Sequence, residues 1–197
     1  MNGLSGTAAE AGRRFAEIEG TRELSLTFSR RIIRNTKRMI HAIHTGEDRS
    51  GISEELEKDA ESMLSAVRDE PSVSSSAPVS DALSEYAEAF ILDAVAERRD
   101  IPTFGDLGIP AQCWVMGLAD VPGELRRMVL NRLSSDDLEG ARYLFGCMEE
   151  IGDEVLGFDV PDAIVPLRRK QDIARGVIER TRSDVTNAIV ISRGRGE

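Results

Sequence analysis

Residues 113–131 read CWVMGLADVPGELRRMVLN, and we expect them to belong to a long helix that runs from about residue 111 to 133. Asp120 and Glu124 are four residues apart in this stretch, so on a helix both side chains project from one face. Pro122 stands between them, and a proline inside a helix costs about 3 kcal/mol and usually produces a kink. Either the helix bends at Pro122, or a new helix begins there with Asp120 as its cap.

A second pair of carboxylates lies in another stretch of helical pattern, from about residue 79 to 99. Glu85 and Glu88 are three residues apart, which again places them on one helical face. Like charges at such spacings destabilise an isolated helix by roughly a few tenths of a kcal/mol, and a bound divalent cation would reverse that cost. Four converging carboxylates would make a magnesium site. The alternative is a solvated helix surface, with Asp120 serving only as a helix cap.

The remaining chain is also helical in its hydrophobic pattern, and the only alternating segment, 188–191, is too short to make a sheet. We therefore expect an all-α fold, a bundle of six or seven helices in one domain over residues 21–192. The other expected helices cover residues 22–44, which Gly46 ends, 53–68 with Ser53 as N-cap, 136–156 and 161–191. Outside them we expect a loose arm or a fraying helix over residues 1–20, a Ser- and Pro-rich loop over 70–80 and a tail over 193–197.

The length and composition favour a single soluble domain. A chain of 197 residues is long enough for one domain with a full core, and no apolar run approaches the roughly 20 residues needed to cross a bilayer. The polar start, MNGLS, has no signal-peptide pattern, so we expect a cytoplasmic protein without membrane contact. Cys113 and Cys147 lack CxxC spacing, and we expect both to be small buried hydrophobic residues.

The formal net charge of −10 would by itself argue against a nucleic-acid binder, because phosphate binding needs concentrated Lys and Arg. Only three of the 25 basic residues are lysines. An excess of arginine together with acidity is typical of a salt-loving, archaeal halophile-like source, although a GC-rich genome gives the same arginine bias. At about 1 M salt the screening length falls to about 3 Å, and RNA binding would then rely on close bidentate Arg contacts and on metal coordination.

A basic stripe follows one face of the first long helix, at a spacing that makes it either a phosphate track or a solvated, salt-bridging surface. The members of the stripe are Arg30, Arg34, Lys37, Arg38 and His41. His41 and His44 are three residues apart, but we expect ordinary roles for them because no acidic third ligand stands nearby in the sequence. Arg126 and Arg127 follow Glu124 directly, and one of them could hold a phosphate group.

The segment 167–174 carries Arg168, Arg169 and Lys170 near the start of the last expected helix. It is either another RNA contact or a partner of the acidic residues within 149–154, which we expect to form a hydrated face. Aromatic residues make up only 5% of the chain, which leaves few platforms for stacking bases. No nucleotide-binding loop, Ser-His-Asp set or zinc spacing competes with the carboxylate site.

The stretch 113–131 resembles the central helix of the translin superfamily, specifically that of its translin-associated factor X (TRAX) branch. Residues 86–89, YAEA, fit the same branch, and residues 29–44, SRRIIRNTKRMIHAIH, are similar to the family's first long helix. The resemblance implies that four residues match the carboxylates with which the TRAX branch holds its catalytic metal, Mg²⁺ or alternatively Mn²⁺. These residues are Glu85, Glu88, Asp120 and Glu124. The plain translin branch lacks an aspartate at the position that matches Asp120.

The resemblance further implies a metal-dependent endoribonuclease that hydrolyses RNA phosphodiester bonds. Family members assemble into hollow octamer-like shells with the acidic site facing inward, so we expect a homo-oligomer of that kind. Its substrate would be single-stranded or short duplex RNA, with ssDNA as a second ligand, and the phosphates would contact the basic stripe and Arg127. Two alternatives stay open: a non-catalytic single-stranded RNA- or DNA-binding protein of the translin type, and a scaffold bundle with an incidental acidic face.

Overall fold

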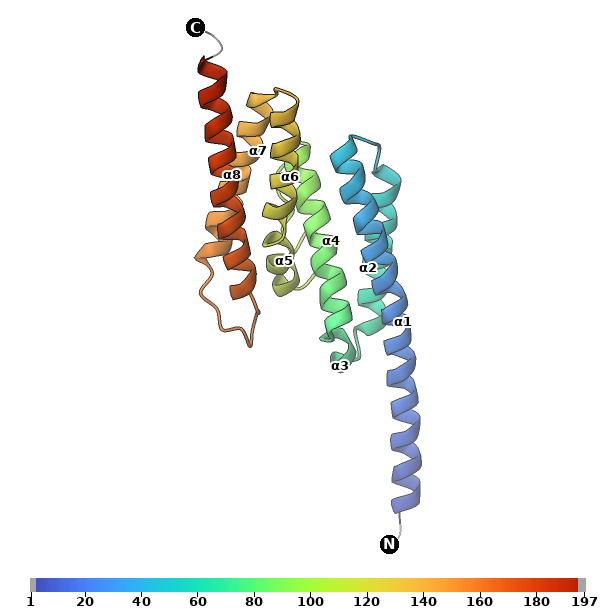
Figure 1. Ribbon diagram of the computed structural model, residues 1–197. Coiled ribbons are helices and arrows are strands. Elements are labelled where there is room, and N and C mark those ends of the chain that lie inside the picture. Colours follow the sequence, from blue (N-terminus) through green and yellow to red (C-terminus); the bar gives the residue numbers. More distant parts are fainter. Residues whose placement is uncertain (1–2, 195–197) are drawn as a thin grey trace.

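The computed structural model describes residues 3–194, and within this range the chain forms helices and no strand (Figure 1). Seven of these helices have eight or more residues, and one has four. Their bounds are α1 Leu4–Thr45, α2 Ser50–Val67, α3 Pro71–Ser74, α4 Ala77–Ala96, α5 Ala111–Leu118, α6 Val121–Ser134, α7 Leu138–Gly157 and α8 Arg168–Gly194. The predicted all-α bundle of six or seven helices is confirmed. Within the described range, no helix combines the length and the apolar character that a membrane span requires.

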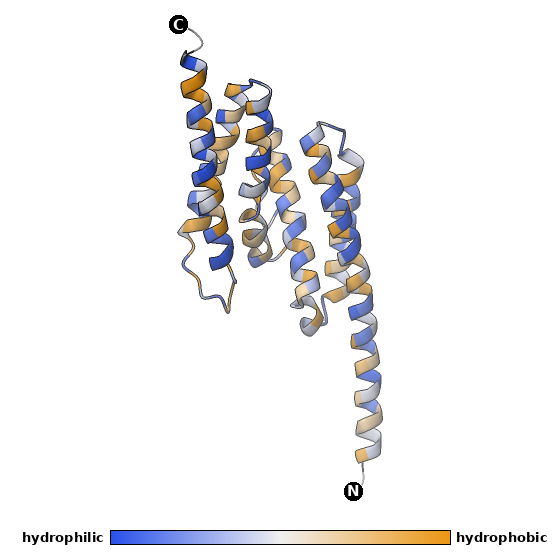
Figure 2. Cartoon of the chain, in the orientation of Figure 1, coloured by the Kyte–Doolittle hydropathy of each residue, from blue (hydrophilic) through white to orange (hydrophobic). Residues whose placement is uncertain are grey.

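Helix α4 lies at the centre of the bundle (Figure 1). It packs against α1 on one side and α5 on the other, α1 packs on α2, and α6, α7 and α8 pack on one another. Leu83, Ile91 and Leu92 of α4 are fully buried, as are Leu125 of α6 and Met148 of α7. Apolar and polar residues are interleaved along the outer helices α1 and α8, because each buries only one face (Figure 2). Helix α4, in contrast, is covered on two sides by neighbouring helices. Glu85 and Glu88 lie on this central helix.

Helix α1 is continuous from Leu4 to the left-handed Gly46 that ends it, as predicted for this glycine. Its first turns extend beyond the rest of the bundle (Figure 1). From Leu4 on, the arm expected over residues 1–20 is therefore the first part of α1, and residues 1–2 lie outside the described range. At the other end of the chain, Arg193 and Gly194 belong to α8, and residues 195–197 of the expected tail are also outside that range.

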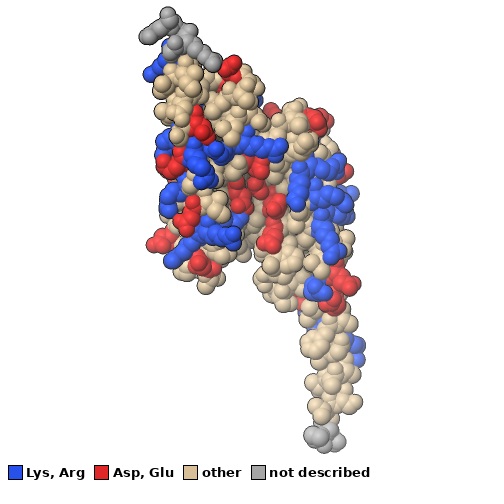
Figure 3. All heavy atoms as spheres, in the orientation of Figure 1, with Lys and Arg blue, Asp and Glu red and all other residues tan. Residues whose placement is uncertain are grey.

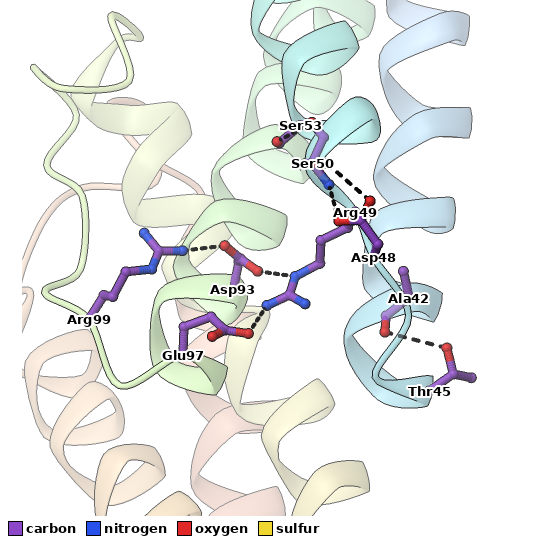
Figure 4. Close-up of polar contacts among 9 residues, drawn as sticks. All are labelled: Ala42, Thr45, Asp48, Arg49, Ser50, Ser53, Asp93, Glu97 and Arg99. Atoms are coloured by element: carbon purple, nitrogen blue, oxygen red, sulfur yellow. Dashed lines mark hydrogen bonds and ion pairs between the residues drawn. The ribbon is translucent and has the colours of Figure 1, made fainter.

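The connection between α1 and α2 is fastened to the C-terminal end of α4 (Figure 4). Arg49 donates hydrogen bonds to Asp93 and Glu97, and Arg99 donates one to Asp93. Asp93 is buried, and a buried carboxylate is costly unless cations or hydrogen bonds compensate it. These contacts hold the end of α1 close to α4.

Other predicted helix boundaries also differ from the structure. Ser53 is not the N-cap of α2, which begins at Ser50, where the backbone N–H donates to Asp48 over 3.2 Å. The last helix begins at Arg168 rather than near residue 161, because Pro166 disfavours a helical conformation for the residue before it. The Ser- and Pro-rich stretch is not a plain loop, since Pro71–Ser74 form α3 and α4 begins at Ala77.

The proline in the 113–131 stretch starts a new helix instead of bending one. Helix α5 ends at Leu118, and α6 begins at Val121, so Pro122 lies in the first turn of α6, where its missing N–H removes no helical hydrogen bond. This outcome is the second of the two predicted alternatives. Asp120 occupies the N-cap position, but its side chain makes no capping hydrogen bond. Its carboxylate is therefore available for other contacts.

Candidate functional site

A close approach between α5 and α4 brings the two carboxylate-bearing segments together. Gly117 of α5 lies against the backbone of α4, and a Cβ atom at this position would lie 2.4 Å from the carbonyl oxygen of Ser84 and 2.9 Å from the backbone nitrogen of Glu88. Real side chains do not tolerate such distances to backbone atoms, so only glycine permits this packing. Because Asp120 follows Gly117 by three residues, the contact places the start of α6 beside Glu88.

The structure brings all four predicted carboxylates into one cluster. Glu85 and Glu88 come from α4, Asp120 from the link between α5 and α6, and Glu124 from the first turn of α6. Glu88 is 8% exposed. Burial, followed by the charges of Asp120, Glu85 and Glu124, raises the pKa of Glu88 from its ordinary 4.5 to about 8. We call these four residues the acidic cluster.

Glu85 has the same kind of perturbation in milder form. Burial, and secondly the charge of Asp120, raises the pKa of Glu85, while the charges of Lys37 and Lys170 oppose the increase. Two carboxylates on the same side of α4 therefore both resist ionisation. An environment of this kind is typical of functional sites, because a folded protein gains no stability from gathering like charges.

Two basic side chains contact the outer carboxylates of the cluster. Lys170, from the first turn of α8, donates hydrogen bonds to Asp120 and to the carbonyl oxygen of Met116, the latter over 3.3 Å. His44, from the last turn of α1, places Nε2 2.5 Å from the carboxylate of Glu124. The His44 side chain is 2% exposed, and its Nδ1 is buried with no hydrogen-bond partner among residues 3–194.

The donor set of the acidic cluster suits a hard divalent cation, because Mg²⁺ and Mn²⁺ prefer carboxylate oxygens. The present side-chain positions do not form a ready-made cage: over the described range, no three His, Cys, Asp or Glu side chains are grouped closely enough to hold a metal ion. Asp120 and Glu124 are engaged by Lys170 and His44, whereas Glu88 makes no hydrogen bond or ion pair within that range. The residues present thus fit a cation in chemistry, provided that the outer carboxylates exchange partners.

Acidic and basic side chains are segregated on the face that carries the cluster. Figure 3 shows acidic side chains in the centre of this face, between α1 and α8, and Lys and Arg side chains on both flanks. On the α1 side, the predicted basic stripe lines a groove of about 750 Å³ beside α2. Within the described range, Arg30, Arg34 and Lys37 make no hydrogen bond or ion pair, while Arg38 contacts Asn35 and, at 3.7 Å, Glu55. The stripe is therefore largely free to bind anions.

The two arginines after Glu124 differ in their contacts. Arg126 donates to Thr181 and forms an ion pair with Asp184, both at 2.9 Å, so it joins α6 to α8. Arg127 is exposed and makes no hydrogen bond or ion pair within residues 3–194. Of the two candidates for a phosphate contact, Arg127 is the one that remains available.

Sequence reasoning missed both basic partners of the cluster. It gave His44 an ordinary role, although its carboxylate partner lies 80 residues further along the chain. It offered the segment around Lys170 either to RNA or to acids within 149–154, but Lys170 binds Asp120, and Glu149 pairs with Arg182 instead. No local spacing could have revealed these contacts. Both cysteines are free thiols, Cys113 buried and Cys147 partly so.

Known proteins share the fold of this chain. No protein-family model matches the chain. An uncharacterized protein of Methanocaldococcus jannaschii is 33% identical over 177 residues, which cover 88% of this chain and 79% of that protein. The crystal structure of an archaeal C3PO, AfC3PO, is 30% identical with a TM-score of 0.78, and the match covers 94% of this chain and 98% of AfC3PO.

The chain belongs to the C3PO/translin family. The structure of AfC3PO in complex with duplex RNA matches with 31% identity and a TM-score of 0.79, over 94% of this chain and 97% of that one. The apo form of a Neurospora C3PO, NeC3PO, matches with 21% identity and a TM-score of 0.82, over 92% of this chain and 96% of that one. At that identity the likeness to NeC3PO concerns the fold alone. The predicted membership of the translin superfamily is thus confirmed.

Proposed function

We propose that this C3PO/translin-family protein is a metal-dependent endoribonuclease of the TRAX type, which hydrolyses RNA phosphodiester bonds at the acidic cluster. The observation that carries the proposal is the convergence of four carboxylates around Glu88, whose pKa is raised to about 8 by burial and by its three acidic neighbours. Such a cluster is costly without a cation, and it offers oxygen ligands only. Asp120 and Glu124 would hold Mg²⁺ or Mn²⁺ directly, with Glu88 and Glu85 as further ligands.

The chemistry follows from what phosphodiester hydrolysis requires. A bound Mg²⁺ supplies neutralisation of charge on the phosphoryl oxygens and a water that is nucleophilic near neutral pH. Of the other residues near the cluster, Arg127 is free to hold a phosphate oxygen. The packing of Gly117 on α4 fixes the backbone that carries Asp120 beside Glu88.

The basic stripe on α1 would guide the RNA backbone to the cluster. Its groove lies on the helix that also carries His44, so a strand that follows α1 arrives at the carboxylates. No base-reading element is evident, so we propose cleavage without strong sequence preference, on single-stranded or short duplex RNA, with ssDNA as a second ligand. One related structure, AfC3PO, was solved with duplex RNA. We further propose an octamer-like homo-oligomer that encloses the site and acts in the cytoplasm.

A specific observation favours one alternative, a non-catalytic single-stranded nucleic-acid-binding protein of the translin type. Asp120 and Glu124 are each engaged by a basic side chain, so the cluster is not arranged as a cage. If these pairs persist when RNA and metal are present, the basic stripe alone would bind RNA. A scaffold bundle, the third possibility, would retain no RNA at all.

The test is cleavage of a labelled single-stranded RNA by purified protein, with Mg²⁺ or Mn²⁺ against EDTA. The wild type is compared with the Asp120→Asn, Glu124→Gln double variant. The matched control is Asp153→Asn, Glu154→Gln, which removes the same two charges from an exposed part of α7. We expect metal-dependent cleavage by the wild type and the control, and none by the double variant. Binding of RNA without cleavage by all three proteins would assign the chain to the translin-like binding class instead.

A further inference from the structure

Lys170 is the side chain through which α8 contacts the acidic cluster. Its ammonium group binds Oδ2 of Asp120 and lies 3.3 Å from the carbonyl oxygen of Met116. The Lys170 side chain is 23% exposed and that of Asp120 is 39% exposed, so the pair is accessible to solvent and ions. Lys170 lies in the first turn of α8, and the chain before α8, residues 158–167, contains no helix.

The contact occupies one of the two carboxylate oxygens of Asp120. A carboxylate oxygen that accepts a hydrogen bond from an ammonium group cannot at the same time bind a divalent ion at that position, because the two positive charges would collide. A lysine side chain is a hydrated point charge on a flexible stem, so it can withdraw into solvent at little cost. His44 is different, since its side chain is only 2% exposed and does not reach solvent as Lys170 does.

We propose that Lys170 is a displaceable counter-ion of the site: it competes with a divalent cation for Asp120, and once displaced it binds a phosphate of the RNA. The proposal rests on the metal-dependent nuclease function proposed above. Either the Lys170 ammonium group or the divalent ion then compensates the charge of Asp120 in every state. Once displaced, the ammonium group lies beside the metal site, where it can bind a phosphate. The ammonium group then contacts a non-bridging phosphate oxygen, which is a favoured partner for lysine.

Lys37 provides a matched control for this inference. It is a second lysine close to the cluster, and its charge acts on Glu85 more strongly than that of Lys170 does. Lys37 makes no hydrogen bond to any carboxylate of the described range. Removing Lys37 therefore changes the electrostatic potential at the cluster without removing a competitor for Asp120.

The first experiment measures Mn²⁺ binding without RNA, by the electron paramagnetic resonance signal of free Mn²⁺. The proteins are the wild type, Lys170→Met, Lys37→Met and Asp120→Asn. We expect Lys170→Met to bind Mn²⁺ about three- to fivefold more tightly than Lys37→Met, because a partly exposed ion pair is worth up to about 1 kcal/mol, which corresponds to a factor of about five. Equal affinities of the two lysine variants would overturn the proposal. Absence of Mn²⁺ binding by all four proteins would overturn the nuclease proposal together with it.

The second experiment needs no variant and therefore does not depend on how Lys170→Met folds. The chain has three lysines, so the rate of acetylation of each can be followed by mass spectrometry, with exposed Lys58 as the internal reference. We expect Mn²⁺ to increase the reactivity of Lys170 relative to Lys58, and a non-cleavable RNA analogue to decrease it again. If Mn²⁺ binds and RNA is cleaved while Lys170 stays equally protected, this inference is wrong and the nuclease proposal stands.

Discussion

Replacing Glu88 with glutamine should weaken the dependence of stability on pH. Glu88 is buried, and its pKa of about 8 in the folded protein lies well above the ordinary 4.5 expected for the unfolded chain. Between these two values the folded state holds a proton that the unfolded state has lost. The free energy of unfolding therefore decreases as pH rises through this window, and it levels off above about pH 8.

The magnitude follows from the size of the pKa difference. Each pKa unit corresponds to about 1.4 kcal/mol, so the loss of stability between about pH 5 and pH 8 amounts to about 4 kcal/mol. The neutral amide of Glu88→Gln avoids this loss at every pH. We expect the variant to match the wild type closely near pH 5, apart from a constant offset for the changed hydrogen bonding, and to exceed it increasingly towards pH 8.

The assay is urea unfolding in EDTA at a series of pH values, followed by the fluorescence of Trp114, the single tryptophan. All proteins are compared at one concentration, because association would otherwise change the apparent stability. Glu61→Gln, an exposed site on α2, serves as the control for removal of a carboxylate. Parallel curves of stability against pH for the wild type and Glu88→Gln would refute the reasoning, since Glu88 would then titrate alike in both states.

Three further changes test other parts of the structure. Gly117→Ala should lower the free energy of unfolding by about 1–3 kcal/mol in the same assay, because the new methyl group meets the backbone of α4. Arg49→Met should cost about 1–3 kcal/mol by thermal or urea unfolding, since it leaves the buried Asp93 without one of its two cations. Replacing Arg30 and Arg34 with glutamine should weaken RNA binding and reduce the slope of log K against log salt by about 1.4, the value for two phosphate contacts on a single strand.

The helical architecture was predictable because apolar residues that recur every three or four positions are a local signal. Helix ends were less so. Ser53 has the chemistry of a cap, but α2 begins three residues earlier, at Ser50, whose backbone N–H donates to Asp48. The predicted helix start near Pro161 was wrong, because Pro166 interrupts the helix. This second proline is visible in the sequence, so the later start could have been predicted.

The candidate site was predictable in part. Spacing could identify each carboxylate pair, but only the packing of Gly117 on α4 brings Asp120 next to Glu88, and a glycine in a helical pattern gives no indication of its partner. Lys170 lies 50 residues from Asp120 in the sequence, and such a contact depends on how α8 packs. The family resemblance predicted which carboxylates form the site, and the packing shows which basic side chains contact them.

The most direct test of the central claim is the single-turnover rate of RNA cleavage as a function of Mn²⁺ concentration, for the wild type and Asp120→Asn. We predict no cleavage without the ion, a rate that saturates with it, and a decrease of at least about 100-fold in the variant, more than the loss of an outer-shell partner of a metal site usually costs. Cleavage that persists in EDTA, or that is as fast in Asp120→Asn as in the wild type, would contradict the assignment of the acidic cluster as the metal centre.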